Sequence, residues 1–186
     1  MKFLRFLSVF FLVSCITFIN DVYAQTKIGV IDTNKIVEKC TAYVQAKKVI
    51  EDEFSKSEKE AGEMQEKFSK RAEDLENKKN IMSAKEYNKK REELNKEAQI
   101  LQKKFYDKRI NLDKEFNNIN KTLNDSLIDI VKNLSEKNHI TVTIDKGMVF
   151  YSDDSTEITD EVISEVNKRL KSIDVNLPQS KDSDSK

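Results

Sequence analysis

The chain has 186 residues, of which 35% are charged and 38% are hydrophobic. A composition this rich in charged, helix-forming residues is typical of long helices and coiled coils and argues against one compact globule. Its 33 basic residues balance its 33 acidic residues, so bulk charge gives no reason to expect a nucleic-acid partner.

The first 24 residues have the pattern of a secretory signal peptide. Lys2 and Arg5 form a positive start, residues 6–19 are largely apolar, and Val22-Tyr23-Ala24 fits a small-residue cleavage site. We therefore predict export, with the leader cleaved after Ala24. A membrane anchor is disfavoured because the apolar run is shorter than about 20 residues.

A second processing route stays open within this leader. Residues 12–15, Leu-Val-Ser-Cys, are similar to a bacterial lipobox. Processing there would lipidate and retain Cys15, which would turn a soluble protein into an anchored one.

The mature chain is predicted to open with a strand and a short helix. Residues 27–32 are rich in β-branched side chains and end in a polar turn, and Asp32 or Thr33 can cap the helix that follows. Cleavage after Ala24 leaves Cys40 as the sole cysteine, so no intrachain disulfide can form. We expect Cys40 to be a small buried residue, with a cross-link between subunits as the alternative.

A long amphipathic helix is predicted over residues 43–81. Its apolar residues recur every seven positions, at Phe54, Ala61, Phe68, Leu75 and Met82. The companion positions are apolar at Ile50 and become polar toward Lys78. Such a seam predicts left-handed wrapping around a partner helix, with looser packing toward the distal end.

A reversal of the chain is predicted near residues 82–84. Ser83 followed by Glu86 has the pattern of a capping box, in which each side chain satisfies the backbone N–H of the other residue. No glycine or proline forces a turn there. The alternative is one uninterrupted rod about 140 Å long, at about 1.5 Å per residue.

The second long helix is predicted over residues 84–137. Its apolar stripe is interrupted by Lys108 and Glu115 and becomes denser from Leu123 onward. Residues 140–151 alternate in polarity around a turn at Asp145-Lys146-Gly147, which predicts a β hairpin.

The end of the chain is predicted to hold one more helix and a tail. Thr159 is the expected N-cap of the helix. From residue 174 the sequence is rich in Ser, Asp and Lys, which predicts a disordered tail over residues 174–186.

These elements predict a fold that is mostly α with a small β part. If the arm turns back, the strand at 27–32 and the hairpin at 140–151 meet and can form one three-stranded sheet. Residues 25–42 and 123–173 then form a small α+β body, and residues 43–122 form a helical hairpin arm. A body of about 60 residues is marginal alone, so we expect a homo-oligomer.

The order of these pieces resembles the Skp/OmpH family of periplasmic chaperones. Residues 27–32 are similar to its opening strand, residues 142–151 to its hairpin, and residues 153–162 to its turn into the last helix. The resemblance implies a periplasmic homotrimer whose helical hairpins surround a cavity. It also implies that the cavity holds unfolded outer-membrane proteins without ATP or any other cofactor. The alternative is a structural coiled-coil protein of the envelope, anchored through Cys15.

Three features of the arm are candidate binding elements. The expected tip is basic, with six cations against Glu86 between residues 78 and 91, and would meet anionic lipid or acidic client segments. Four apolar residues lie off the seam and could hold unfolded chains weakly at many points. Gly62 interrupts the first helix and could act as a hinge. The tip cations are Lys78, Lys79, Lys85, Lys89, Lys90 and Arg91, and the off-seam residues are Tyr87, Ile100, Tyr106 and Ile110.

Each of these features also has a plainer interpretation. The tip charges could be a solvated helix end, the apolar residues could be ordinary surface residues, and Gly62 could be a tolerated surface glycine. Catalysis and metal binding find no support in the sequence. The sole histidine, His139, stands at an expected helix end, and no nucleophile, phosphate loop or Cys/His cluster is visible.

Overall fold

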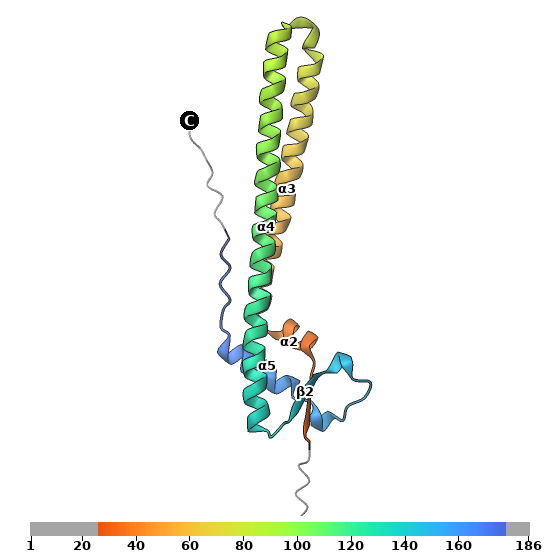
Figure 1. Ribbon diagram of the computed structural model, residues 1–186, viewed down its shortest axis with the longest axis vertical. Helices are drawn as coiled ribbons and strands as arrows, with labels where there is room; N and C mark the ends of the chain where they lie inside the picture. The colour runs from red at the N-terminus through yellow and green to blue at the C-terminus, as the bar shows by residue number, and fades with distance from the viewer. Residues whose placement is uncertain (1–25, 178–186) are drawn as a thin grey trace, which may run out of the picture.

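The computed structural model describes residues 26–177 as a long helical hairpin on a small α/β body (Figure 1). The predicted signal peptide, its cleavage site after Ala24 and the lipobox at Cys15 lie outside the described residues. The fold is mostly α with a small β part, as predicted, and the uninterrupted rod is excluded because the two long helices lie side by side.

The arm consists of α3, Thr41–Asn77, and α4, Ala84–Lys137. At about 1.5 Å per residue, α4 is about 80 Å long. The chain reverses through a short 3-10 turn, η1, Lys79–Ile81. The first helix is therefore shorter at its distal end than the 43–81 range that the sequence predicted, and the turn occupies the difference.

Ser83 begins α4 as its N-cap, as the sequence predicted. Its hydroxyl accepts a hydrogen bond from the Glu86 N–H at 3.2 Å. Only this half of the expected capping box is formed, because the Glu86 carboxylate instead pairs with Lys90 at 3.0 Å.

The body begins with β1, Ile28–Ile31, and α2, Thr33–Lys39, which Asp32 caps by accepting from the Lys35 N–H. The helical path breaks for one residue at Cys40, before α3. Asn167, which lies on α5, Thr159–Arg169, bridges the two ends of this break. Its side chain accepts from the Thr41 N–H and donates to the Lys39 carbonyl, both at 3.0 Å.

The predicted hairpin at 140–151 is wrong. Only β2, Val142–Asp145, forms there, and it pairs with β1 in parallel, with Ile28 opposite Val142. The Asp145 carboxylate prevents the tight turn. It accepts from the Thr33 N–H and hydroxyl and from the Gly147 N–H, which folds residues 146–148 into a 3-10 turn, η2. Gly147 does not adopt the positive φ that a type I′ turn needs.

The predicted three-stranded sheet is therefore also wrong, and the sheet has two strands. The place of a third strand is taken by a single bridge from Val30 to Glu157. The Ile158 N–H donates to the Val30 carbonyl at 2.9 Å, which brings the start of α5 against β1.

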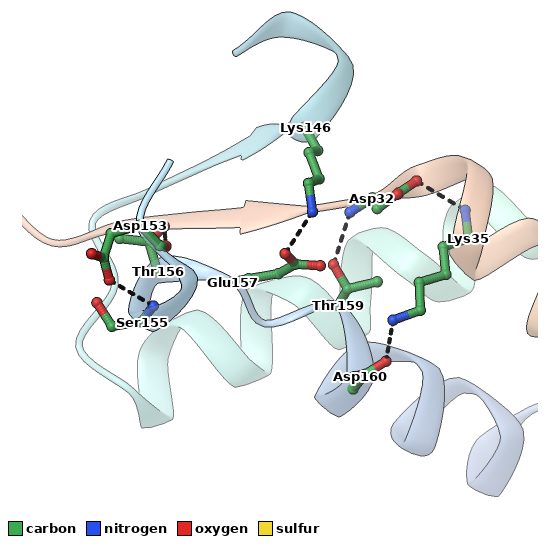
Figure 2. A network of polar contacts seen from close by, with 9 residues as sticks. All are labelled: Asp32, Lys35, Lys146, Asp153, Ser155, Thr156, Glu157, Thr159 and Asp160. Carbon is green, nitrogen blue, oxygen red and sulfur yellow. Dashed lines mark hydrogen bonds and ion pairs between the residues drawn. The ribbon is translucent and has the colours of Figure 1, made fainter. Parts of the chain in front are cut away.

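Polar contacts join β1, the loop after β2 and the start of α5 (Figure 2). Lys146 pairs with Glu157 at 2.7 Å, and Lys35 pairs with Asp160 at 2.8 Å. Thr159, expected as an N-cap, is instead the first residue of α5, and its hydroxyl accepts from the Asp32 N–H at 2.9 Å. These contacts fix α5 across the end of β1 and the start of α2.

The hydrophobic core runs from the body into the base of the arm. Ile36, Ile119 and Val162, which come from α2, α4 and α5, are fully buried within it. Cys40 is fully buried in the same cluster and is a free thiol. This position fits the expectation that Cys40 is a small buried residue.

His139 follows the end of α4 in the left-handed conformation, with φ of 56°. The Ile140 N–H donates to the Ser135 carbonyl and the His139 N–H to the Glu136 carbonyl. This is a Schellman motif, in which a glycine usually takes the position of His139. The histidine therefore has a structural place at a helix end.

Residues 174–177 are not the start of a disordered tail. The chain continues beyond α5 beside α4 (Figure 1), and Val175 and Leu177 pack against the core cluster. Residues 178–186, the rest of the predicted tail, lie outside the described residues.

Candidate functional site

The arm is held together by an apolar seam that weakens toward its tip. Ile50 and Leu112, near the base, are almost fully buried, whereas Phe68 and Leu75 are only half-buried. Met64, at a companion position of the seam, is exposed. The gradient that the heptad pattern predicted is therefore present in the burial of the side chains.

Open hollows lie along the seam between α3 and α4. One of them has a volume of about 470 Å³ and is lined by residues that include Ala61, Phe68, Ala98 and Phe105. The two alanines leave this part of the interface short of side-chain volume. An arm packed in this way exposes apolar surface along its length.

Lys108, which interrupts the apolar stripe of α4, forms a polar contact across the seam. Its ammonium lies 2.8 Å from a Glu53 oxygen and 3.5 Å from a Glu60 oxygen. Burial alone would lower the pKa of Lys108, but its two carboxylate partners outweigh that effect and raise the pKa. The hydrogen bond from Lys108 holds the pKa of Glu53 below its usual range.

Three of the four predicted off-seam residues present apolar surface to solvent on α4. Ile100 is 69% exposed, Tyr106 64% and Ile110 46%. Tyr106 and Ile110 are four residues apart and share one face of the helix.

Tyr87 differs from the other three because it takes part in the reversal. Its hydroxyl donates to Glu76 at 2.5 Å, and the Lys79 ammonium lies 5.3 Å from the centre of its ring. The hydrogen bond to Glu76 raises the pKa of Tyr87, and the same bond lowers the pKa of Glu76. These contacts give Tyr87 a structural role at the tip.

The basic residues of the predicted tip gather around the reversal, and half of them are paired. Lys79 binds Glu76 at 2.9 Å, Lys90 binds Glu86 at 3.0 Å, and Lys89 lies 3.9 Å from Glu93. Arg91 lies close enough to Glu76 to help lower the pKa of that carboxyl.

Two tip lysines stand outside this pairing. Across residues 26–177, no salt bridge within 4.0 Å joins Lys78 or Lys85 to a carboxylate. Together with the Arg91 guanidinium, these two ammonium groups carry the positive charge of the tip that no salt bridge among the described residues offsets.

Gly62 lies exposed within α3, and a Cβ added there would meet no heavy atom within 4 Å. Neither tight packing nor unusual backbone geometry requires a glycine at this position. In the part of the chain that is described, no helix is long and apolar enough to cross a bilayer. The same residues contain no group of three or more side chains suited to hold a metal ion.

One buried polar residue of the arm base was recognised in the sequence only as an interruption. Glu115 is 8% exposed, and its carboxylate accepts from the Asn118 side chain and the Asn176 N–H, both at 3.1 Å. Its second donor is a backbone group 61 residues away, so no spacing in the sequence could have identified it.

The chain matches the family model described as outer membrane protein (OmpH-like) over residues 27–166. The chain belongs to the OmpH-like family. That range takes in β1, the whole arm and most of α5, so the family assignment rests on the complete helical hairpin and its body. The expected family is thereby confirmed.

A solved structure has the same fold as this OmpH-like chain. The crystal structure of an OmpH-like outer membrane chaperone from Caulobacter crescentus aligns with a TM-score of 0.72 at 13% sequence identity. The alignment covers 83% of this chain and 91% of that chain. A comparison with curated proteins finds no match.

Proposed function

We propose that this chain is an exported, ATP-independent holdase chaperone of the periplasm that binds unfolded outer-membrane proteins and prevents their aggregation. The proposal is supported by membership of the OmpH-like family and by the fold shared with a chaperone structure. In this proposal the protein is not an enzyme and needs no cofactor.

The observation that carries the proposal is the apolar surface of the arm. Ile100, Tyr106 and Ile110 are exposed on a helix whose seam is itself incompletely filled. Single contacts of this kind are weak, and their combined effect on one flexible chain supplies affinity through avidity. Weak contacts at many points also let a client leave without an energy source.

A homotrimer is part of the proposal. The body leaves Met148, Phe150 and Tyr151 exposed in the loop after β2, with Ile28 and Val142 exposed on the two-stranded sheet. Exposed apolar residues gathered on a small body favour burial against another subunit. Joined bodies would place three arms around one cavity.

The free charges of the tip support a second contact. Lys78 and Lys85 would attract anionic lipid headgroups or acidic client segments over a range of about 10 Å at 0.1 M salt. The formal net charge of zero gives the chain no bulk attraction for polyanions, so the proposal includes no nucleic-acid partner.

Export follows from the leader, with cleavage after Ala24 in this proposal. The mass of the mature N-terminus tests it. A chain beginning at Gln25 supports a soluble periplasmic protein, and a lipidated Cys15 would show an anchored one.

Suppression of aggregation tests the function. An unfolded β-barrel protein is diluted out of urea with and without the mature protein, and light scattering is followed. We expect scattering to fall as the chaperone reaches one trimer per client. Unchanged scattering at trimer excess would contradict the proposal and favour a structural coiled-coil role.

A further inference from the structure

The segment after α5 binds the base of the arm as an extended chain. Residues 171–177, here called the C-terminal strap, follow Arg169 and run beside α4 (Figure 1). Ile173, Val175 and Leu177 are half-buried against the core, whereas Asp174 and Asn176 are exposed. This alternation is that of an extended chain with one face against a surface.

The strap also makes a polar contact with α4 through its backbone. The Asn176 N–H donates to the Glu115 carboxylate at 3.1 Å, while the Asn176 side chain stays exposed. Glu115 is 8% exposed, and a buried carboxylate needs such donors to offset its lost hydration. The site therefore recognises a main-chain N–H and apolar side chains at every second residue.

Any extended chain with alternating apolar side chains presents these same features. The strands of transmembrane β-barrels alternate in this way, with apolar residues facing lipid at every second position. The family match ends at residue 166, so the strap lies outside the matched range.

We propose that the strap is a built-in competitor at a binding site for extended client segments, which lies at the base of the arm beside Glu115. The inference rests on the proposed holdase function and assigns to it a specific subsite. A client segment takes the place of the strap, with its own N–H on Glu115 and its apolar side chains in the positions of Ile173, Val175 and Leu177.

Competition of this kind lowers the apparent affinity for clients. If the strap occupies the site about nine-tenths of the time, the site binds a client about tenfold more weakly than when it is free. Loosening the strap should therefore strengthen the holding of clients rather than weaken it. A merely structural strap would have the opposite effect or none.

Matched variants test this inference. The first replaces Ile173, Val175 and Leu177 with serine, and its control replaces the outward-facing Asp174 and Asn176 with serine. The Asn176 N–H is kept in both. Client affinity is measured with an unfolded β-barrel protein, after circular dichroism and the mass of the oligomer have shown that each variant is folded and assembled.

A second readout uses the unaltered protein, so the test does not depend on a stable variant. Hydrogen–deuterium exchange of residues 171–177 is followed with and without client. We expect the inward-facing variant to bind client up to about tenfold more tightly than the control, and strap exchange to rise when client is added.

The outcomes separate the two proposals. Equal client affinity in both variants, together with strap exchange that client leaves unchanged, would overturn the competitor role and leave the holdase function standing. Absence of client holding in the wild-type protein and in every variant would overturn the holdase function and the competitor role with it.

Discussion

Replacing Lys108 with methionine should loosen the arm without changing its shape. Methionine keeps the long aliphatic stem in the seam and removes the ammonium that lies 2.8 Å from Glu53 and 3.5 Å from Glu60. The Lys108 side chain is 21% exposed and that of Glu53 is 26% exposed, so the pair lies between a surface and a buried ion pair.

The expected loss follows from that position. Exposed pairs contribute about 0–1 kcal/mol, and breaking a buried pair costs about 3–5 kcal/mol. A half-buried pair should therefore cost about 1–2 kcal/mol, or roughly 3–6 °C in melting temperature for a chain of this size. A second substitution, Glu53→Gln, should recover part of the loss because it removes the carboxylate left without its cation.

The stability that the pair of Lys108 and Glu53 contributes should depend on pH. The folded pKa of Glu53 is depressed below its usual value of 4.5 by the hydrogen bond from Lys108. The stability that this carboxylate contributes is therefore present above pH 4.5 and is lost as the pH falls through the folded pKa.

Urea unfolding followed by circular dichroism measures both effects. The wild type and Lys108→Met should differ at neutral pH and converge in acid, as the pH falls through the depressed pKa of Glu53. Equal stability of the two proteins at neutral pH, or a difference that persists unchanged in acid, would refute this reasoning.

Other changes give independent tests. His139→Gly should raise the free energy of unfolding by about 0.5–1 kcal/mol, because glycine adopts the left-handed conformation without strain; a lower melting temperature would contradict the Schellman assignment. Gly62→Ala should stabilise α3 by up to about 1 kcal/mol, and if client size range stays unchanged in binding assays, the hinge role fails. Lys78→Glu with Lys85→Glu should weaken binding to anionic vesicles at low salt and have little effect at high salt; equal binding at both salt concentrations would refute the tip contact.

The sequence predicted the arm well because its determinants are local and periodic. The seven-residue spacing from Phe54 to Leu75 requires a partner helix, and Ser83 marks where that partner begins. The return of the chain then brings β1 and β2 together. Each of these conclusions depends on residues close together in the sequence.

The body was predicted less well because its contacts join distant residues. Asp145 has the pattern of a hairpin turn, yet its carboxylate binds Thr33, which is 112 residues away. In the sequence, Lys108 and Glu115 are only interruptions of an apolar stripe. The partners of Lys108 lie on α3, and Glu115 has a partner in the strap. No local pattern contains that information.

The sequence alone indicates where some apolar residues of the arm point, but it does not indicate the contacts of Tyr87. Tyr106 and Ile110 could be placed off the seam because helical spacing fixes their direction. Tyr87 could not be distinguished from them, because its hydrogen bond to Glu76 depends on the shape of the reversal.

Site-specific photo-cross-linking tests most directly whether the arm holds clients. A photoreactive residue replaces Tyr106 or Ile110, and another replaces the exposed Ser164 of α5 as the control. Each protein is mixed with an unfolded β-barrel client and irradiated. We expect client adducts from both arm positions and few from Ser164; adducts from Ser164 alone, or equal yields from all three positions, would contradict the account.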